Sequence, residues 1–172
     1  MALSRPIHPM RTTLLALPAA LLALAAAAAP SGPDRVALPP DWEQRFIRFA
    51  TVDDTDRGMV RHIHLDPAAH AGLRPGTPAP EGALLVMADA RAQRDATGRP
   101  LRDAAGRFVA EPGWVGIYAQ SKTSGAWRFA AFDGAGRPRE VSLAPCAACH
   151  ALARAQQDHT FTLWDYAEAR GR

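Results

Sequence analysis

The feature that most constrains this chain is the segment Cys146-Ala147-Ala148-Cys149-His150, which lies near the C-terminus and contains both cysteines of the sequence. Two thiols separated by two residues and followed at once by a histidine form the pattern that attaches a c-type haem. The thiols add to the two vinyl groups of the haem, and the adjacent imidazole ligates the iron. The segment therefore predicts one covalent haem c per chain, attached through Cys146 and Cys149, with His150 as the axial iron ligand.

Closely spaced cysteines also occur in disulfides, in zinc sites and in redox dithiols. A thioredoxin-like dithiol is expected beside a βαβ unit, whereas this motif lies close to the end of the chain. A structural zinc site needs more ligands at regular spacing, and the chain contains no further cysteine. We therefore favour haem attachment, which leaves no cysteine for a disulfide.

The N-terminus has the pattern of a secretory signal peptide over residues 1–29. Residues 1–11 contain two arginines, and residues 12–29 carry no charge and are rich in leucine and alanine. This pattern predicts cleavage within residues 25–29. An uncleaved membrane anchor is the alternative, since the run is about long enough to span a bilayer, but its alanines and Pro18 disfavour it. Bacterial c-type haem is attached outside the cytoplasm, so export agrees with the motif and the expected location is the periplasm.

Length and charge indicate one small domain. Without residues 1–29 about 143 residues remain, which is the size of a single domain. The removed segment contains two of the 20 Lys and Arg residues and none of the 17 Asp and Glu residues, so the net charge is about +1. No basic stripe suggests a nucleic-acid partner. We expect a linker over residues 30–40, a haem domain over residues 41–166 and a polar tail over residues 167–172.

Apolar patterns predict an α+β fold. Trp42, Phe46 and Phe49 fall at helical spacing and would share one helix face, either in the core or against the haem. Residues 59–65 alternate as in a strand with two different faces, and two later runs form a hairpin. A haem-attachment helix is expected over residues 149–157, near the C-terminus. The order of elements predicts a mainly antiparallel β-sheet with flanking helices.

Four polar side chains of the expected strands are of interest. Arg61 shares its strand face with apolar residues and needs a partner, for which a haem propionate or an anionic ligand is a candidate. His62 and His64 alternate onto the opposite face. We expect them on a solvated or dimer-facing surface rather than at a metal. Lys122, the only lysine in the chain, is expected to be solvated at a hairpin end.

Besides the haem motif, several further segments form a recognisable combination. They are Leu38-Pro39-Pro40-Asp41-Trp42, Arg61 followed by Leu65-Asp66-Pro67, Glu81-Gly82-Ala83, Trp114-Val115-Gly116-Ile117 with Trp127, and His159-Thr160-Phe161. Together they resemble the cytochrome P-460 family, from about Leu38 to Tyr166. The resemblance implies an antiparallel sheet with flanking helices, usually in a homodimer, and a five-coordinate haem with an open distal face.

The resemblance also implies which residues lie at the distal face. Family members that oxidise hydroxylamine carry a lysine that is cross-linked to the haem, and Met87 takes its place here. Tyr118 takes the place of a distal carboxylate, and Arg61 corresponds to the distal arginine. A sister group, the cytochromes c-prime-beta, lacks the cross-link and binds nitric oxide and carbon monoxide. This sequence resembles that group more, so we expect no lysine–haem bond.

Three functions remain open from the sequence. The first is binding of nitric oxide or a similar small gas in an apolar distal pocket, with hydrogen bonds from Arg61 and Tyr118. The second is oxidation of hydroxylamine or peroxide with Tyr118 as the proton-handling group, although a phenol is a poor base at neutral pH. The third is electron transfer with a partner cytochrome through a six-coordinate haem. The candidates for its sixth ligand are Met59, His62, His64, His70, Met87 and His159.

Overall fold

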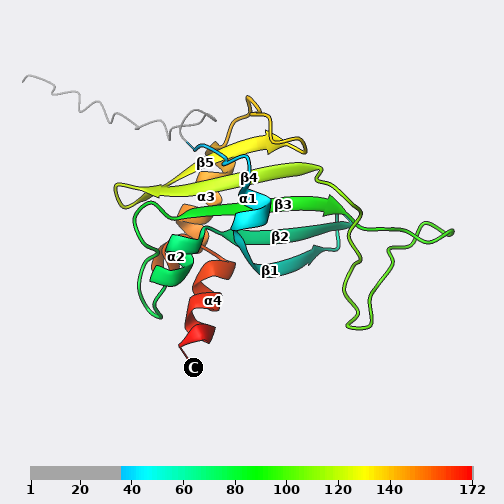
Figure 1. The fold of residues 1–172 in the computed structure, drawn as a ribbon, viewed down its shortest axis with the longest axis horizontal. Coiled ribbons are helices and arrows are strands. Elements are labelled where there is room, and N and C mark those ends of the chain that lie inside the picture. The colour runs from blue at the N-terminus through cyan, green and yellow to red at the C-terminus, as the bar shows by residue number, and fades with distance from the viewer. Residues whose placement is uncertain (1–35, 172) are drawn as a thin grey trace, which may run out of the picture.

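The computed structural model describes residues 36–171, so the predicted signal peptide and half of the predicted linker lie outside the described residues. Within this range the chain forms a five-stranded antiparallel sheet in the order β1-β2-β3-β4-β5, flanked by helices (Figure 1). The predicted α+β class is confirmed. Among the described residues, no helix is long and apolar enough to cross a bilayer. The elements are α1 (Trp42–Arg45), β1 (Ile47–Asp54), β2 (Met59–Leu65), α2 (Pro67–Gly72), β3 (Leu84–Arg91), β4 (Gly116–Thr123), β5 (Ala126–Asp133), α3 (Ala144–Ala153), the 3-10 helix η2 (Ala155–Gln157) and α4 (Thr162–Arg170).

Each strand of the sheet pairs with its neighbours in sequence, so the sheet is a meander. The central strand β3 starts with an apolar run, which is the pattern of a strand covered on both faces. In the register of the sheet, Met87 lies between Ile63 of β2 and Tyr118 of β4. Alternation along the strands then gives the sheet two faces, which we call the Met87 face and the Val86 face.

The Val86 face is covered by α1. Trp42 of α1 packs with Val86 in an apolar cluster. His62 and His64 lie under this cover, only 9% and 7% exposed. Their rings are edge-on to Trp114 and Trp42, at centroid distances of 5.6 and 5.1 Å respectively. The prediction that both histidines face solvent or a dimer partner is therefore wrong, because the alternation gave the correct face but not the helix that covers it.

The predicted helical face of Trp42, Phe46 and Phe49 is also wrong, because α1 has only four residues. Phe46 is already extended, and Phe49 lies in β1, where its ring packs against α4. The sequence that follows explains the early end, because residues 47–52 are rich in β-branched and aromatic side chains, which favour a strand.

The Met87 face is covered by α2, α3 and α4, on the side of the sheet away from α1 (Figure 1). Leu163 of α4 packs with Leu65 in the apolar cluster of this face. The haem-motif helix α3 begins earlier than predicted, because Pro145 occupies its first turn, where proline is tolerated. The segment predicted as a polar tail from residue 167 continues α4 instead, and Ala167 is buried.

Candidate haem site

A cavity of about 600 Å³ lies between the Met87 face of the sheet and the helices α3 and α4. This volume is typical of small-molecule and cofactor sites. The cavity wall is mainly apolar, and the described residues that line it include no carboxylate and no lysine. Side chains that line it are Arg57, Arg61, Ile63, Met87, Tyr118, Phe129, Cys146, His150, Phe161 and Leu163.

Helix α3 presents the haem motif to this cavity. Cys146 and His150 are four residues apart, so they lie on one face of α3, and both line the cavity. Cys149 is one turn along and exposed, and neither cysteine is in a disulfide. The structure therefore brings most of the predicted site residues to one cavity, namely Cys146, His150, Arg61, Met87 and Tyr118.

A backbone carbonyl orients the imidazole of His150. The Nδ1 atom of His150 lies 2.6 Å from the carbonyl oxygen of His159, so Nδ1 carries the proton and donates it. The Nε2 atom then keeps its lone pair, which is the form that ligates a metal. Phe129 and Phe161 pack edge-on against the ring at centroid distances of 5.2 and 4.8 Å. Sequence reasoning predicted none of these contacts, because they depend on how α3 packs against β5 and against the residues that follow η2.

This donor set fits a haem c. It consists of two accessible thiols on one helix, an imidazole with a fixed tautomer and an apolar cavity beside them. Over residues 36–171, no three His, Cys, Asp or Glu side chains come together as a metal site. The zinc interpretation of the two cysteines therefore finds no further ligands in this range.

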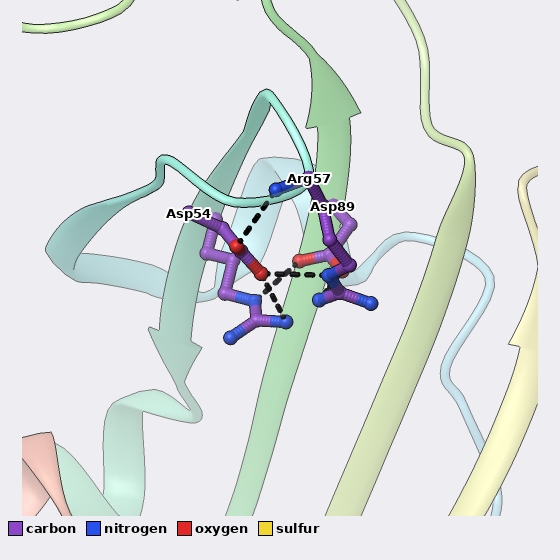
Figure 2. Close-up of polar contacts among 4 residues, drawn as sticks. Asp54, Arg57 and Asp89 are labelled. Carbon is purple, nitrogen blue, oxygen red and sulfur yellow. Dashed lines mark hydrogen bonds and ion pairs between the residues drawn. The ribbon is translucent and has the colours of Figure 1, made fainter.

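Two arginines and two aspartates form a network at the end of the cavity nearest the β1–β2 turn (Figure 2). The Arg61 guanidinium contacts Asp89 at 3.1 Å and Asp54 at 2.9 Å. Arg57 contacts the same carboxylates, Asp54 at 2.7 Å and Asp89 at 3.4 Å. The partner that Arg61 was predicted to need is thus supplied by the protein itself. Two positive and two negative charges offset one another, so this end of the cavity is close to neutral.

Asp89 is the most buried member of this network, at 4% exposure. Burial raises the pKa of Asp89, and the adjacent Arg57 opposes that rise. Sequence reasoning missed Asp89 and Arg57. A usable signal was the strand register, because Asp89 of β3 lies directly opposite Arg61 of β2.

The chain matches the family model for cytochrome P-460 over residues 39–162, which is most of its length. It belongs to the cytochrome P-460 family. No curated protein matches the chain significantly. The matched range contains all five strands and the Cys146–His150 motif, so the resemblance predicted from the sequence is confirmed, and haem binding follows from the family.

Met87 and Tyr118 of this cytochrome are cross-strand neighbours and both line the cavity. The phenol ring of Tyr118 lies back over Gly116, where a Cβ atom would come within 3.4 Å of the phenol oxygen. Gly116 is paired with Asp89 in the sheet. The Tyr118 hydroxyl is therefore directed toward the end of the cavity that holds the charged network.

Of the six candidate sixth ligands, only Met87 lines the cavity. His62 and His64 lie on the opposite face of the sheet, and burial lowers the pKa of both, that of His64 to about 4. His70 is bonded through Nε2 to the hydroxyl of Tyr166 at 2.7 Å. His159 contributes its backbone carbonyl to the site, but its side chain does not line the cavity.

Lys122 of the cytochrome is not solvated, and that prediction is wrong. Its side chain is buried at 5% exposure, and its Nζ atom lies 2.6 Å from Oδ1 of Asp158. No pattern in the sequence indicates this pair, because Asp158 lies in a turn between η2 and α4. Lys122 does not line the cavity, so its ammonium group is held away from the expected haem position.

Proposed function

We propose that this cytochrome is an exported, periplasmic protein that binds nitric oxide or a similarly small, neutral gas at one covalent haem c. The proposal rests on the character of the cavity beside His150. Its wall is mainly apolar, and no carboxylate or lysine of residues 36–171 lines it. Its arginines, Arg57 and Arg61, are already paired with aspartates. Such a cavity favours an uncharged ligand over an anion, because an anion would have to displace an existing ion pair.

In this proposal each site residue has a distinct role. When bound, the haem would supply an iron able to take a small ligand. Cys146 and Cys149 hold the group covalently, and His150 provides the axial nitrogen. Met87 and Ile63 exclude water from the open face, and the Tyr118 hydroxyl donates a hydrogen bond to the ligand.

The same cavity argues against hydroxylamine or peroxide oxidation. That chemistry needs a group that accepts a proton near the ligand. The described residues that line the cavity include no carboxylate. Tyr118, which the resemblance puts in the place of the family carboxylate, is a phenol and a poor base at neutral pH. Met87 is a thioether and cannot form the bond that the family lysine makes. The sole lysine, Lys122, is committed to Asp158.

Electron transfer through a six-coordinate haem is a second candidate, since Met87 lines the cavity and methionine is a common sixth ligand in cytochromes c. The matched variant is Met87→Leu, which keeps the apolar volume and removes the sulfur. Under our proposal the wild-type ferrous protein is high-spin and binds carbon monoxide rapidly, and Met87→Leu behaves in the same way. A low-spin wild type that becomes high-spin in Met87→Leu would establish the electron-transfer alternative.

The covalent link has its own test, in protein matured by a host that attaches c-type haem. Acid–acetone extraction should leave the haem on the wild type and on Met87→Leu. It should remove any haem from the double variant Cys146→Ser/Cys149→Ser. Extraction of haem from the wild type would refute covalent attachment.

A further inference from the structure

The only lysine in the chain forms a buried ion pair next to the haem motif, outside the cavity itself. We propose that Lys122 and Asp158 form a clamp that positions His150, by fixing the backbone turn whose carbonyl accepts the His150 proton. The clamp would make both residues positioning residues for the axial ligand. This inference rests on the proposed role of His150 at the haem.

Asp158 is anchored to three separate parts of the fold. Its Oδ1 atom accepts from Lys122 Nζ of β4 at 2.6 Å, and its Oδ2 atom accepts from the backbone N–H of Ala79 at 2.8 Å. Its backbone carbonyl accepts from the indole N–H of Trp127 in β5 at 2.7 Å. The Lys122 ammonium also lies 5.6 Å from the centre of the Trp127 ring, within the range of a cation–π contact. These anchors attach the turn to two strands and to the loop before β3.

The backbone of this turn needs such support. Asp158 and His159 are both left-handed, with φ angles of 51° and 56°. This conformation is unfavourable for residues with a side chain and persists only where the surroundings hold it. Backbone bonds from His159 N to Arg154 O and from Thr160 N to Gln157 O define the shape of the turn. The contacts of Asp158 hold this turn in place against the sheet.

The next residue after Asp158 makes the link to the site. The carbonyl oxygen of His159 lies 2.6 Å from Nδ1 of His150. A hydrogen bond from the second ring nitrogen orients a metal-bound histidine and raises its basicity as a ligand. A displacement of the turn would lengthen this bond, and His150 would then be a weaker electron donor. Lys122 therefore acts on the iron through Asp158 and the His159 carbonyl, although it does not touch the cavity.

Stability alone is a poor explanation for the pair. A buried ion pair loses much of its Coulomb energy to desolvation, and apolar replacements are often neutral or stabilising. The pair does, however, require one geometry, because both charges are buried and Asp158 uses both carboxylate oxygens. This requirement for one geometry suits a role in positioning the His159 carbonyl against His150.

The test compares variants of the haem-loaded protein by resonance Raman spectroscopy and by redox titration. In Lys122→Met/Asp158→Asn the ion pair is removed without leaving a buried unpaired charge, and asparagine tolerates the left-handed turn. Trp127→Phe removes the indole N–H that donates to the Asp158 carbonyl and keeps an aromatic ring near Lys122. Both variants should lower the stretching frequency of the iron–histidine bond in the ferrous state and raise the midpoint potential.

The matched control is Val86→Ala, which removes buried methyl groups from the opposite face of the sheet. It should lower the free energy of unfolding and leave the iron–histidine frequency at the wild-type value. Wild-type frequency and potential in both Trp127→Phe and the double variant would overturn the clamp. That result, with covalent haem intact, refutes the clamp alone, whereas a wild type without covalent haem refutes the proposed function and the clamp together. If the double variant fails to fold, Trp127→Phe decides the question.

Discussion

Acid should destabilise this protein through His64. The His64 ring is buried beside Trp42, and its Nδ1 atom has no hydrogen-bond partner among the described residues. Burial, together with the neighbouring His62 and Arg48, lowers the pKa of His64 from 6.5 to about 4. Protonation of the folded protein would therefore place a poorly solvated charge in the apolar cluster under α1.

The sign and the size of the effect follow from these two pKa values. The unfolded chain binds the His64 proton near pH 6.5, whereas the folded chain binds it only near pH 4. Between these values the unfolded state holds more protons, so the free energy of unfolding falls as the pH falls. Between pH 8 and pH 5 the loss from this group is about 2 kcal/mol. The pKa of His62 is also lowered, mainly by burial, and acts in the same direction.

The variant His64→Phe tests this reasoning, because it keeps an aromatic ring against Trp42 and removes the proton site. Urea unfolding at pH 8 and pH 5 should show that the wild type loses about 2 kcal/mol more than His64→Phe over this range. Val86→Ala, at the cross-strand neighbour of His64, is the control. Its free energy of unfolding should be lower than that of the wild type by the same amount at both pH values. Parallel pH profiles for the wild type and His64→Phe would refute the assignment.

Three further predictions concern the haem pocket. Arg61→Leu should lower the free energy of unfolding by about 2 kcal/mol in urea titrations, because it leaves buried Asp89 with Arg57 alone. The double variant Arg61→Leu/Asp89→Leu should recover most of that loss. An unchanged stability of Arg61→Leu would contradict the network. Protease digestion of the denatured wild type should release haem on a single peptide around Cys146–His150, and mass spectrometry that found haem on a second peptide would contradict this. In Met87→Lys a second haem-linked peptide should appear if Met87 occupies the position of the family lysine.

The parts of the site that are local in sequence could be predicted. The spacing of the motif Cys146–His150 predicts a haem c, and two of its residues line the cavity; the alternation in β2 assigned Arg61 and Ile63 to the same face, and both line the cavity. Met87 and Tyr118 followed from the family resemblance, and both line the cavity. The placement of Arg61 and Ile63 succeeded because strand periodicity depends on neighbouring residues only.

The failures share one physical cause, which is that burial depends on segments distant along the chain. The pattern of β2 could not show that α1 covers His62 and His64. The position of Lys122 at a hairpin end gave no sign of Asp158, which lies 36 residues later. From the sequence alone, a polar side chain in a strand is therefore expected to face solvent. Only its tertiary contacts, such as the hydrogen bonds and ion pairs that it forms, show that it is buried.

The meander topology has a consequence for the order in which the protein matures. Every strand pairs with its neighbours in sequence, so each pairing can form as soon as the next strand is available, without waiting for a later part of the chain. The haem motif follows β5 and therefore arrives after the complete sheet. Both cysteines stay exposed on α3 in the folded chain. Under the proposed covalent attachment, these thiols would therefore be reached on an assembled sheet, as a last step of folding rather than as its nucleus.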